Sequence, residues 1–267
     1  MVAPFFHVDA FTDAALRGNP AAVVVLDDER DDVWLQAVAA EMNLPETAFL
    51  RPLGGGVWSL RWCTPTVEVE LCGHATLASA HALWELGRAT EGEPIAFDTR
   101  SGRLVATRRD ARIELEFPAL IVAPRPAPAG VLAALGVRAD EVEFAASHPN
   151  GYGFLVVADA ARVRALQPDF VALGRQPEAF LVTAPSDHPE YDFVSRFFAP
   201  SFGIDEDPVT GAAHCMLGPY WSSRLGKPVV TGFQASARTG VVECEPRGDR
   251  VLLRGNAVTV VQGELVA

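Results

Sequence analysis

The spacing of hydrophobic residues predicts strands and one amphipathic helix at the start of the chain. Phe5 to Ala10 alternates between apolar and polar residues, and Ala21 to Leu26 is an uninterrupted apolar run typical of a buried strand. From Asp31 to Met42 the apolar residues recur at helical spacing, which predicts an amphipathic helix. Residues 43–45 end that helix, and Thr47 to Leu50 starts another strand.

Two stretches rich in small residues predict helices that are packed on all sides. Gly73 to Trp84 consists largely of alanine, leucine and small polar residues, and Gly211 to Leu225 is a second such stretch. We expect each to be a central helix wrapped by sheet, because neither offers a polar face to solvent. Pro118 to Pro128 reads as a linker, and a short helix is predicted near 131–135. Further strands are predicted at 57–63, 67–71, 96–97, 104–107, 112–117, 154–157, 180–183, 192–198 and 257–262.

The chain carries one sequence pattern twice. RWCTP at Arg61 to Pro65 is echoed by RFFAP at Arg196 to Pro200, and each copy then reaches the glycine that opens a predicted central helix. We therefore predict a first lobe at 1–118 and a second lobe at 119–256, with the active-site cleft between them. The last strand, about 257–267, could return to the first lobe.

Composition excludes several partner classes. The net charge of −12, with only 22 basic residues in 267, argues against nucleic acid or an anionic membrane as the main partner. No stretch approaches the length of an apolar membrane span, and the amino terminus does not resemble a secretion signal. The four cysteines form no Cys-x-x-Cys motif, and the histidines form no local metal pattern. We therefore expect a cytoplasmic, enzyme-like protein that holds no metal.

Five segments of the sequence resemble the phenazine-biosynthesis PhzF-like isomerases. They are residues 9–12 (DAFT), 18–23 (GNPAAV), 41–49 (EMNLPETAF), 71–77 (LCGHATL) and 206–214 (EDPVTGAAH). The resemblance covers nearly the whole chain in the family's order. It implies an α+β fold of the diaminopimelate epimerase-like type, in which two pseudo-symmetric lobes each wrap a curved mixed sheet around a central helix. It also implies a homodimer that uses no cofactor.

Glu46 is the first candidate for catalysis, because it resembles the family's acid/base glutamate. Its neighbours Leu44, Pro45 and Ala48 are apolar, and an apolar cleft raises the pKa of a carboxyl group, which lets it both take and return a proton. The alternative is a helix capping box at residues 43–46. We disfavour it because a strand-like run follows.

His74 and Asp207 resemble the family's polar pocket residues, which contact substrate and assist proton movement. We predict that both are catalytic together with Glu46. The structural alternatives are a satisfied core histidine for His74 and a helix N-cap for Asp207, with Pro208 at the first helical position.

The starts of the two central helices are candidate anion sites. Backbone N–H groups at a helix N-terminus attract a carboxylate, and small residues leave them accessible. The alternative is that these residues are small only for close packing. The predicted substrate-binding residues are Asn19, Gly73, Ser101, Gly211, Ala212 and Ala213.

Cys72 raises an alternative chemistry. Related racemases and epimerases of this fold use one thiol from each lobe, and Cys72 resembles the first of those two positions. The second lobe offers no cysteine beside Gly211, and Cys215 lies one helical turn too deep. We interpret Cys72 as a small buried hydrophobe.

Together these features favour an isomerase that moves a proton between carbons of a small carboxylate-bearing metabolite, with Glu46 as general acid/base. A thiol-dependent racemase or epimerase and a non-catalytic metabolite-binding protein are the alternatives. The resemblance makes trans-2,3-dihydro-3-hydroxyanthranilate a natural test compound.

Overall fold

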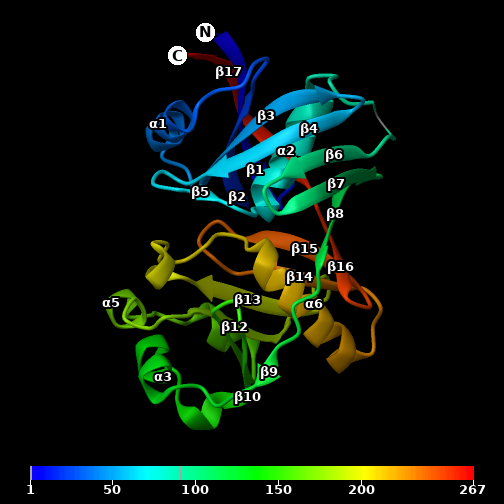
Figure 1. The fold of residues 1–267 in the computed structure, drawn as a ribbon. Helices are drawn as coiled ribbons and strands as arrows, with labels where there is room; N and C mark the ends of the chain where they lie inside the picture. Colours follow the sequence, from blue (N-terminus) through cyan, green and yellow to red (C-terminus); the bar gives the residue numbers. More distant parts are fainter. Residues whose placement is uncertain (1, 91) are drawn as a thin grey trace. The chain divides into compact units, whose positions relative to one another are not determined.

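The computed structural model describes residues 2–90 and 92–267, and the chain divides into two compact units. Unit 1 comprises Met1–Glu116 and Leu253–Ala267, and unit 2 comprises Phe117–Leu252. Each unit combines a mixed sheet with a few helices, so the predicted α+β class is confirmed (Figure 1). None of the helices in the described residues is long and apolar enough to cross a membrane.

Unit 1 is built from one mixed sheet and two helices. Its elements are β1 (Val2–Ala10), β2 (Asn19–Val25), α1 (Asp32–Met42), β3 (Glu46–Gly54), β4 (Val57–Cys63), β5 (Glu68–Val69), α2 (Gly73–Glu85), β6 (Ile95–Thr99), β7 (Gly102–Arg109), most of β8 (Arg112–Pro118) and β17 (Ala257–Val266). The last strand therefore pairs with the first, as β17 runs antiparallel to β1.

Helix α2 is the central helix of unit 1. It contacts β1, β2, β3, β7 and β17, and most of its side chains are buried, including those of Ala75, Leu77, Ala80 and Leu83. In Figure 1 it lies behind the strands β3, β4 and β6. The prediction of a helix packed on all sides is confirmed for this element, because small side chains let strands approach it from several directions.

Unit 2 repeats the construction. Its elements are β9 (Ala123–Pro124), α3 (Ala129–Leu135), a 3₁₀ turn at Ala139–Glu141, β10 (Val142–His148), β11 (Tyr152–Val157), α4 (Ala160–Arg164), α5 (Phe170–Leu173), β12 (Ala179–Pro185), β13 (Phe193–Phe198), a 3₁₀ turn at Pro200–Phe202, α6 (Gly211–Leu225), β14 (Val230–Gln234), β15 (Gly240–Arg247) and the first half of β16 (Arg250–Gly255).

The strand pairings of the two units follow the same sequence. In unit 1, β1–β2 is antiparallel, β2–β3 parallel, β3–β4 antiparallel, β4–β6 parallel and β6–β7 antiparallel. In unit 2 the corresponding series is β10–β11, β11–β12, β12–β13, β13–β14 and β14–β15, with the same alternation. The repeat in the sequence is thus a repeat of topology.

Helix α6 anchors the core of unit 2 through Trp221. The indole ring stacks on Phe193 at 5.8 Å between ring centroids, and its N–H donates to the hydroxyl of Thr183 at 3.1 Å. All three side chains are fully buried. The helix also contacts β14 and β15.

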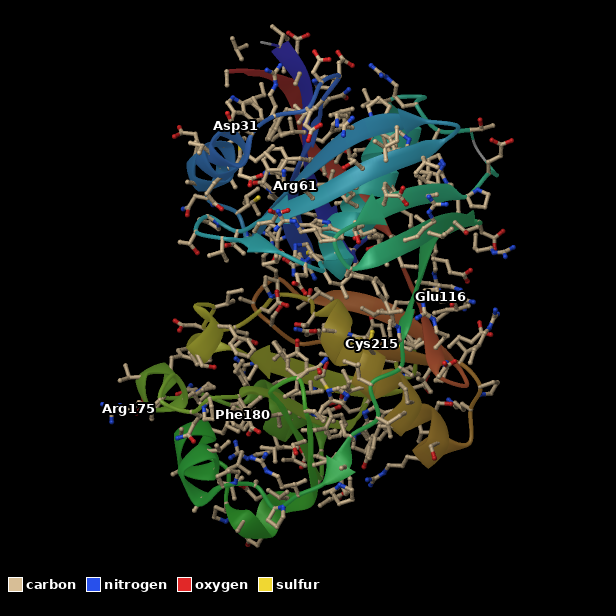
Figure 2. All side chains as sticks on the ribbon, viewed as in Figure 1. Asp31, Arg61, Glu116, Arg175, Phe180 and Cys215 are labelled. Atoms are coloured by element: carbon tan, nitrogen blue, oxygen red, sulfur yellow. The ribbon has the colours of Figure 1, made fainter. Side chains whose placement is uncertain are left out.

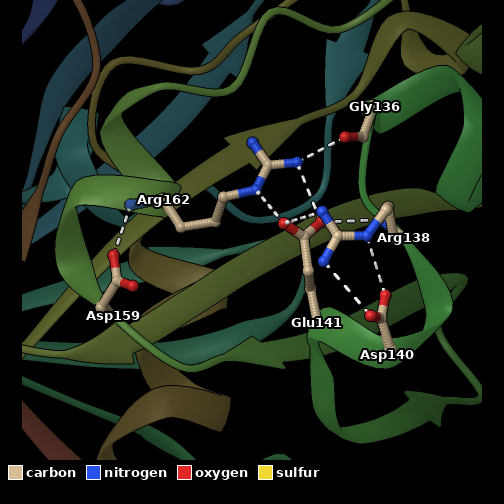
Figure 3. Close-up of polar contacts among 6 residues, drawn as sticks. All are labelled: Gly136, Arg138, Asp140, Glu141, Asp159 and Arg162. Carbon is tan, nitrogen blue, oxygen red and sulfur yellow. Dashed lines mark hydrogen bonds and ion pairs between the residues drawn. The ribbon is translucent and has the colours of Figure 1, made fainter.

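An arginine network fastens the outer helices of unit 2 (Figure 3). Arg162, on α4, donates to both carboxylate oxygens of Glu141 at 3.2 and 3.3 Å and to the carbonyl of Gly136, at the end of α3. Arg138 forms a second fork on Asp140 at 2.9 and 3.2 Å. None of these charged residues belongs to the apolar cluster that includes Val131, Leu135, Val157 and Val163.

Candidate functional site

Glu46 and His74 meet inside unit 1. Glu46 is the first residue of β3 and lies in parallel register with Ala21 of β2, whereas His74 is the second residue of α2. The Nε2 atom of His74 lies 3.1 Å from the Oε2 atom of Glu46. The two side chains are only 8% and 12% exposed, respectively, so the contact is largely removed from bulk water.

The local sequence explains why Glu46 stands at the start of a strand. Helix α1 ends at Asn43, whose φ of 51° is left-handed and whose N–H donates to the carbonyl of Ala39 at 3.1 Å. The chain then enters β3 at Glu46 itself. The capping-box alternative is therefore wrong, because residue 43 closes a helix rather than opening one.

Burial keeps His74 neutral at physiological pH. Desolvation lowers the pKa of this imidazole to about 4, and a hydrogen bond to the backbone of Pro20 opposes the shift only in part. A neutral ring beside Glu46 brings no positive charge to the carboxylate. It can therefore orient a proton or a substrate group without pairing permanently with the glutamate.

Asn19 lies at the edge of the same region. It is fully buried as the first residue of β2, next to Pro20 and two residues before Ala21, the strand partner of Glu46. The preceding Gly18 has a φ of +67°, and a Cβ there would lie 2.2 Å from the carbonyl oxygen of Ala10. Only glycine fits that turn, which precedes Asn19 at the start of β2.

Cys72 completes a small cluster with Glu46 and His74. Its Sγ atom lies 3.5 Å from Nδ1 of His74, and the cysteine is the N-cap residue of α2. One sulfur, one nitrogen and one carboxylate oxygen from the three residues lie within 4.8 Å of one another. Such a donor set could hold a transition metal such as Zn²⁺. The sequence predicts that the protein uses none, and that stays a prediction.

Gly73 opens the N-terminal turn of α2. The backbone N–H of Thr76 donates to the carbonyl of Cys72 at 3.2 Å and is the first amide to bond within the helix. By helix geometry the amides of residues 73–75 have no partner within the helix. They can therefore serve an anion, and Gly73 is the residue among them that carries no side chain.

Asp207 occupies a separate cluster in unit 2. Its N–H donates to the carbonyl of Phe197 at 3.1 Å, and its Oδ2 accepts from the hydroxyl of Thr210 at 2.6 Å. Thr210 is the N-cap of α6, which begins at Gly211. The N-cap alternative for Asp207 is therefore wrong, because this residue lies in the loop before the helix.

Gln234 holds that loop, although nothing in the sequence pattern singled it out. This fully buried side chain accepts from the N–H of Thr210 at 2.9 Å and donates to the carbonyl of Asp207 at 2.7 Å. Nearby, Ser236 donates to the carbonyl of Pro208 at 2.7 Å. Gln234 is a polar residue at a core-facing position of β14, whose residues alternate between buried and half-buried positions.

The remaining predicted binding residues fall into two settings. Gly211, Ala212 and Ala213 form the first turn of α6, and the N–H of His214 is the first amide after them to bond within the helix, to the carbonyl of Thr210 at 3.2 Å. Ser101 lies in the exposed turn between β6 and β7, where its contacts are with Thr99. Their role in substrate binding stays a prediction.

The chain is similar to known proteins in both sequence and fold. Residues 8–263 match the family model described as phenazine biosynthesis-like protein, PhzC-PhzF. The chain is 47% identical to an uncharacterized isomerase of Halalkalibacterium halodurans, with 100% of this chain and 99% of that protein covered. A crystal structure of a PhzF-family phenazine biosynthesis protein from Enterococcus faecalis has a TM-score of 0.93 at 38% identity, covering 100% of both chains.

The fold extends to more distant proteins. A predicted epimerase from Pseudomonas aeruginosa has a TM-score of 0.72 at 20% identity, with 99% of each chain covered. That likeness confirms the epimerase-like architecture expected from the sequence. The chain belongs to the phenazine biosynthesis-like PhzC-PhzF family, and it is an enzyme of the isomerase class.

Proposed function

We propose that this isomerase works without a cofactor and moves a proton between two carbons of a small carboxylate-bearing metabolite, with Glu46 as the general acid/base. The single observation that supports it best is the 3.1 Å contact of the Glu46 carboxylate with a neutral, buried imidazole. A general base needs to be within reach of its proton and shielded from competing water, and a side chain 12% exposed satisfies the second condition.

The proposed reaction needs only one carboxyl group. Glu46 takes a proton from a carbon, and the electron pair of the broken C–H bond spreads into the conjugated system of the substrate. The protonated Glu46 then delivers the same proton to another carbon of that system, which regenerates the carboxylate. Since His74 stays neutral, it can hold a polar substrate group beside the glutamate through both steps.

Binding is assigned to the helix N-termini and to Asp207. The amides at Gly73, or those at Gly211 to Ala213, would receive the substrate carboxylate and the charge that develops in the transition state. Asp207, fixed by Thr210, would receive an amino or hydroxyl group. Asn19 and Ser101 remain predicted contacts. The shared cleft, the homodimer and the cytoplasmic location also stay predictions.

A thiol-dependent racemase is the second candidate, favoured by the 3.5 Å contact of Cys72 with His74. The two-base mechanism needs another thiol, and Thr210 holds the N-cap position in unit 2 that Cys72 holds in unit 1. Burial also raises the pKa of Cys215 to about 12, which disfavours its reactive thiolate. The proton-transfer isomerase is therefore the stronger proposal.

The test compares turnover of trans-2,3-dihydro-3-hydroxyanthranilate, and of related cyclic unsaturated carboxylates, by wild type and Glu46→Gln. We expect the variant to lose about 10³-fold or more in kcat while its thermal unfolding is nearly unchanged. A Glu46→Gln enzyme that keeps its turnover would exclude the proposed role.

A further inference from the structure

In each unit, one arginine on a strand donates two hydrogen bonds to the carboxylate of a glutamate. On β4, Arg61 donates from Nε and Nη2 to the two carboxylate oxygens of Glu68 at 2.8 and 2.6 Å. On β13, Arg196 donates from the same two nitrogens to Glu206 at 2.7 and 2.8 Å. We call these pairs the unit 1 fork and the unit 2 fork. Figure 2 labels Arg61.

The two forks occupy equivalent positions. Arg61 and Arg196 are the matching residues of the sequence repeat, and Glu68 precedes Gly73 by the same number of residues as Glu206 precedes Gly211. The backbone next to each glutamate also pairs in the same way. Val69 faces Trp62 in the β4–β5 pair, and the N–H of Asp207 bonds to the carbonyl of Phe197 at 3.1 Å.

Both forks therefore join a strand to the loop that enters a central helix. In unit 1 the loop leads from Glu68 to Cys72 and His74, and in unit 2 Glu206 is followed at once by Asp207. The residue after the fork is apolar Val69 in one unit and the candidate site residue Asp207 in the other. The arginine–glutamate fork is repeated in the two units, whereas the residue that follows the glutamate is not.

The unit 2 fork is built into the protein. The side chains of Arg196 and Glu206 are 11% and 17% exposed. Arg196 also donates to the carbonyl of Leu166 at 2.7 Å, and its guanidinium lies 4.8 Å from the ring centroid of Phe198. Two parallel hydrogen bonds fix the orientation of the carboxylate as well as its distance from the guanidinium. Because Leu166 and Phe198 also hold the guanidinium of Arg196, the pair gives the loop that follows Glu206 a fixed starting position.

We propose that Arg196 and Glu206 are positioning residues that set the place of Asp207 and the N-terminus of α6, and that Arg61 and Glu68 do the same for the entry to α2. The expected effect on the rate rests on the proposed function, whereas the expected effect on the position of the loop does not. Misplacing a substrate-orienting group by about 1 Å can cost a factor of about 10² in rate.

The test uses Glu206→Gln and the matched control Glu178→Gln. Glu178 also accepts two hydrogen bonds from one arginine, from Nη1 and Nη2 of Arg125 at 2.7 and 2.8 Å, and its side chain is 14% exposed. Both variants lose one largely buried charge and weaken one arginine–glutamate pair in unit 2. They differ in whether that pair holds the loop before α6.

Two measurements are made on both variants. Amide hydrogen exchange is followed at Asp207 and Thr210, whose N–H groups bond to Phe197 and Gln234. We expect about tenfold or faster exchange in Glu206→Gln and about twofold change or less in Glu178→Gln. The kcat on the substrate turned over by wild type should fall by about 10- to 100-fold only in Glu206→Gln, while the pH dependence of kcat keeps its midpoint, because Glu206 does not transfer the proton.

Unchanged exchange at both amides, or faster exchange with an unchanged kcat, would overturn the proposal. If Glu206→Gln does not fold, Glu206→Asp keeps the charge and shortens its reach, and the same two outcomes decide. A failure of the proposed function is detected by a different variant. It would appear as turnover retained by Glu46→Gln, whatever the results for Glu206→Gln and Glu178→Gln.

Discussion

The imidazole Nε2 of His74 lies 3.1 Å from the carboxylate Oε2 of Glu46, where the start of α2 faces the start of β3. The histidine is neutral because burial lowers its pKa to about 4. A carboxylate beside a neutral imidazole can move away from the ring and accept a proton from carbon. The same carboxylate locked to a permanent cation could do so only by giving up a stable ion pair.

Two buried histidines, His74 and His214, predict acid sensitivity of the fold. Burial lowers the pKa of His74 and of His214 to about 4, whereas an unfolded chain protonates histidine near pH 6.5. Between these values the unfolded state binds more protons, so stability falls as the pH drops from about 6.5 to 4. Each histidine should cost about 2 kcal/mol between pH 7 and pH 5. Urea unfolding of wild type at both pH values measures the total loss of stability, which includes this contribution.

A histidine variant separates this effect from general acid denaturation. His214→Asn keeps a donor for the carbonyl of Thr210 but cannot be protonated, so its stability should fall less between pH 7 and pH 5. The exposed His188→Gln is the control. An identical loss of stability in wild type and His214→Asn would contradict the prediction.

Cys72→Ser should retain turnover within about twofold of wild type. The thiol has no counterpart at the equivalent N-cap position in unit 2, where Thr210 stands, so a two-thiol mechanism lacks its second half. Steady-state kinetics on the same substrate checks this. A loss of about 100-fold would move the assignment to the racemase chemistry.

Removing metal ions should leave the rate unchanged. Glu46, Cys72 and His74 could offer three ligand atoms to an ion, yet in the proposed proton transfer the carboxylate of Glu46 binds no metal. Dialysis against a strong chelator followed by assay tests this expectation. Activity that disappears and returns on adding Zn²⁺ would refute it.

Gly18→Ala should destabilise the protein far more than Gly55→Ala. Both glycines have left-handed φ values, +67° and +61°, so the backbone penalty of about 1–2 kcal/mol is shared. At Gly18 the new Cβ would lie 2.2 Å from the Ala10 carbonyl oxygen, whereas at Gly55 it would meet nothing within 4 Å. We expect a further loss of about 2 kcal/mol or more in Gly18→Ala, measured by chemical denaturation. Equal losses would show that the turn before Asn19 relaxes freely.

The sequence pattern predicts the framework well because apolar runs and small-residue helices are local signals. The two central helices appear at Gly73 and Gly211, where the pattern places their starts. Strand β10 (Val142–His148) was missed, since polar residues interrupt its apolar pattern. Helices α4 and α5 are too short for helical periodicity to be detected.

The contacts within the candidate site could not be predicted from local sequence patterns. Glu46 and His74 are neighbours only because β2 and β3 pair in parallel and α2 packs on both strands, a relation that no spacing in the sequence encodes. The resemblance to a known family named both residues. It gave no indication of Gln234, whose role depends on a strand from further along the chain reaching back to the loop at Asp207.

The most direct test of the central claim follows deuterium from heavy water into carbon-bound positions of substrate and product, comparing wild type with Glu46→Gln. The account predicts that wild type forms the isomer, with deuterium at the carbon that receives the proton whenever the Glu46 carboxyl exchanges with solvent before returning it. Glu46→Gln should form neither isomer nor labelled substrate. Isomer formation at the wild-type rate by Glu46→Gln, with label still entering carbon, would mean that another base moves the proton and would contradict the account.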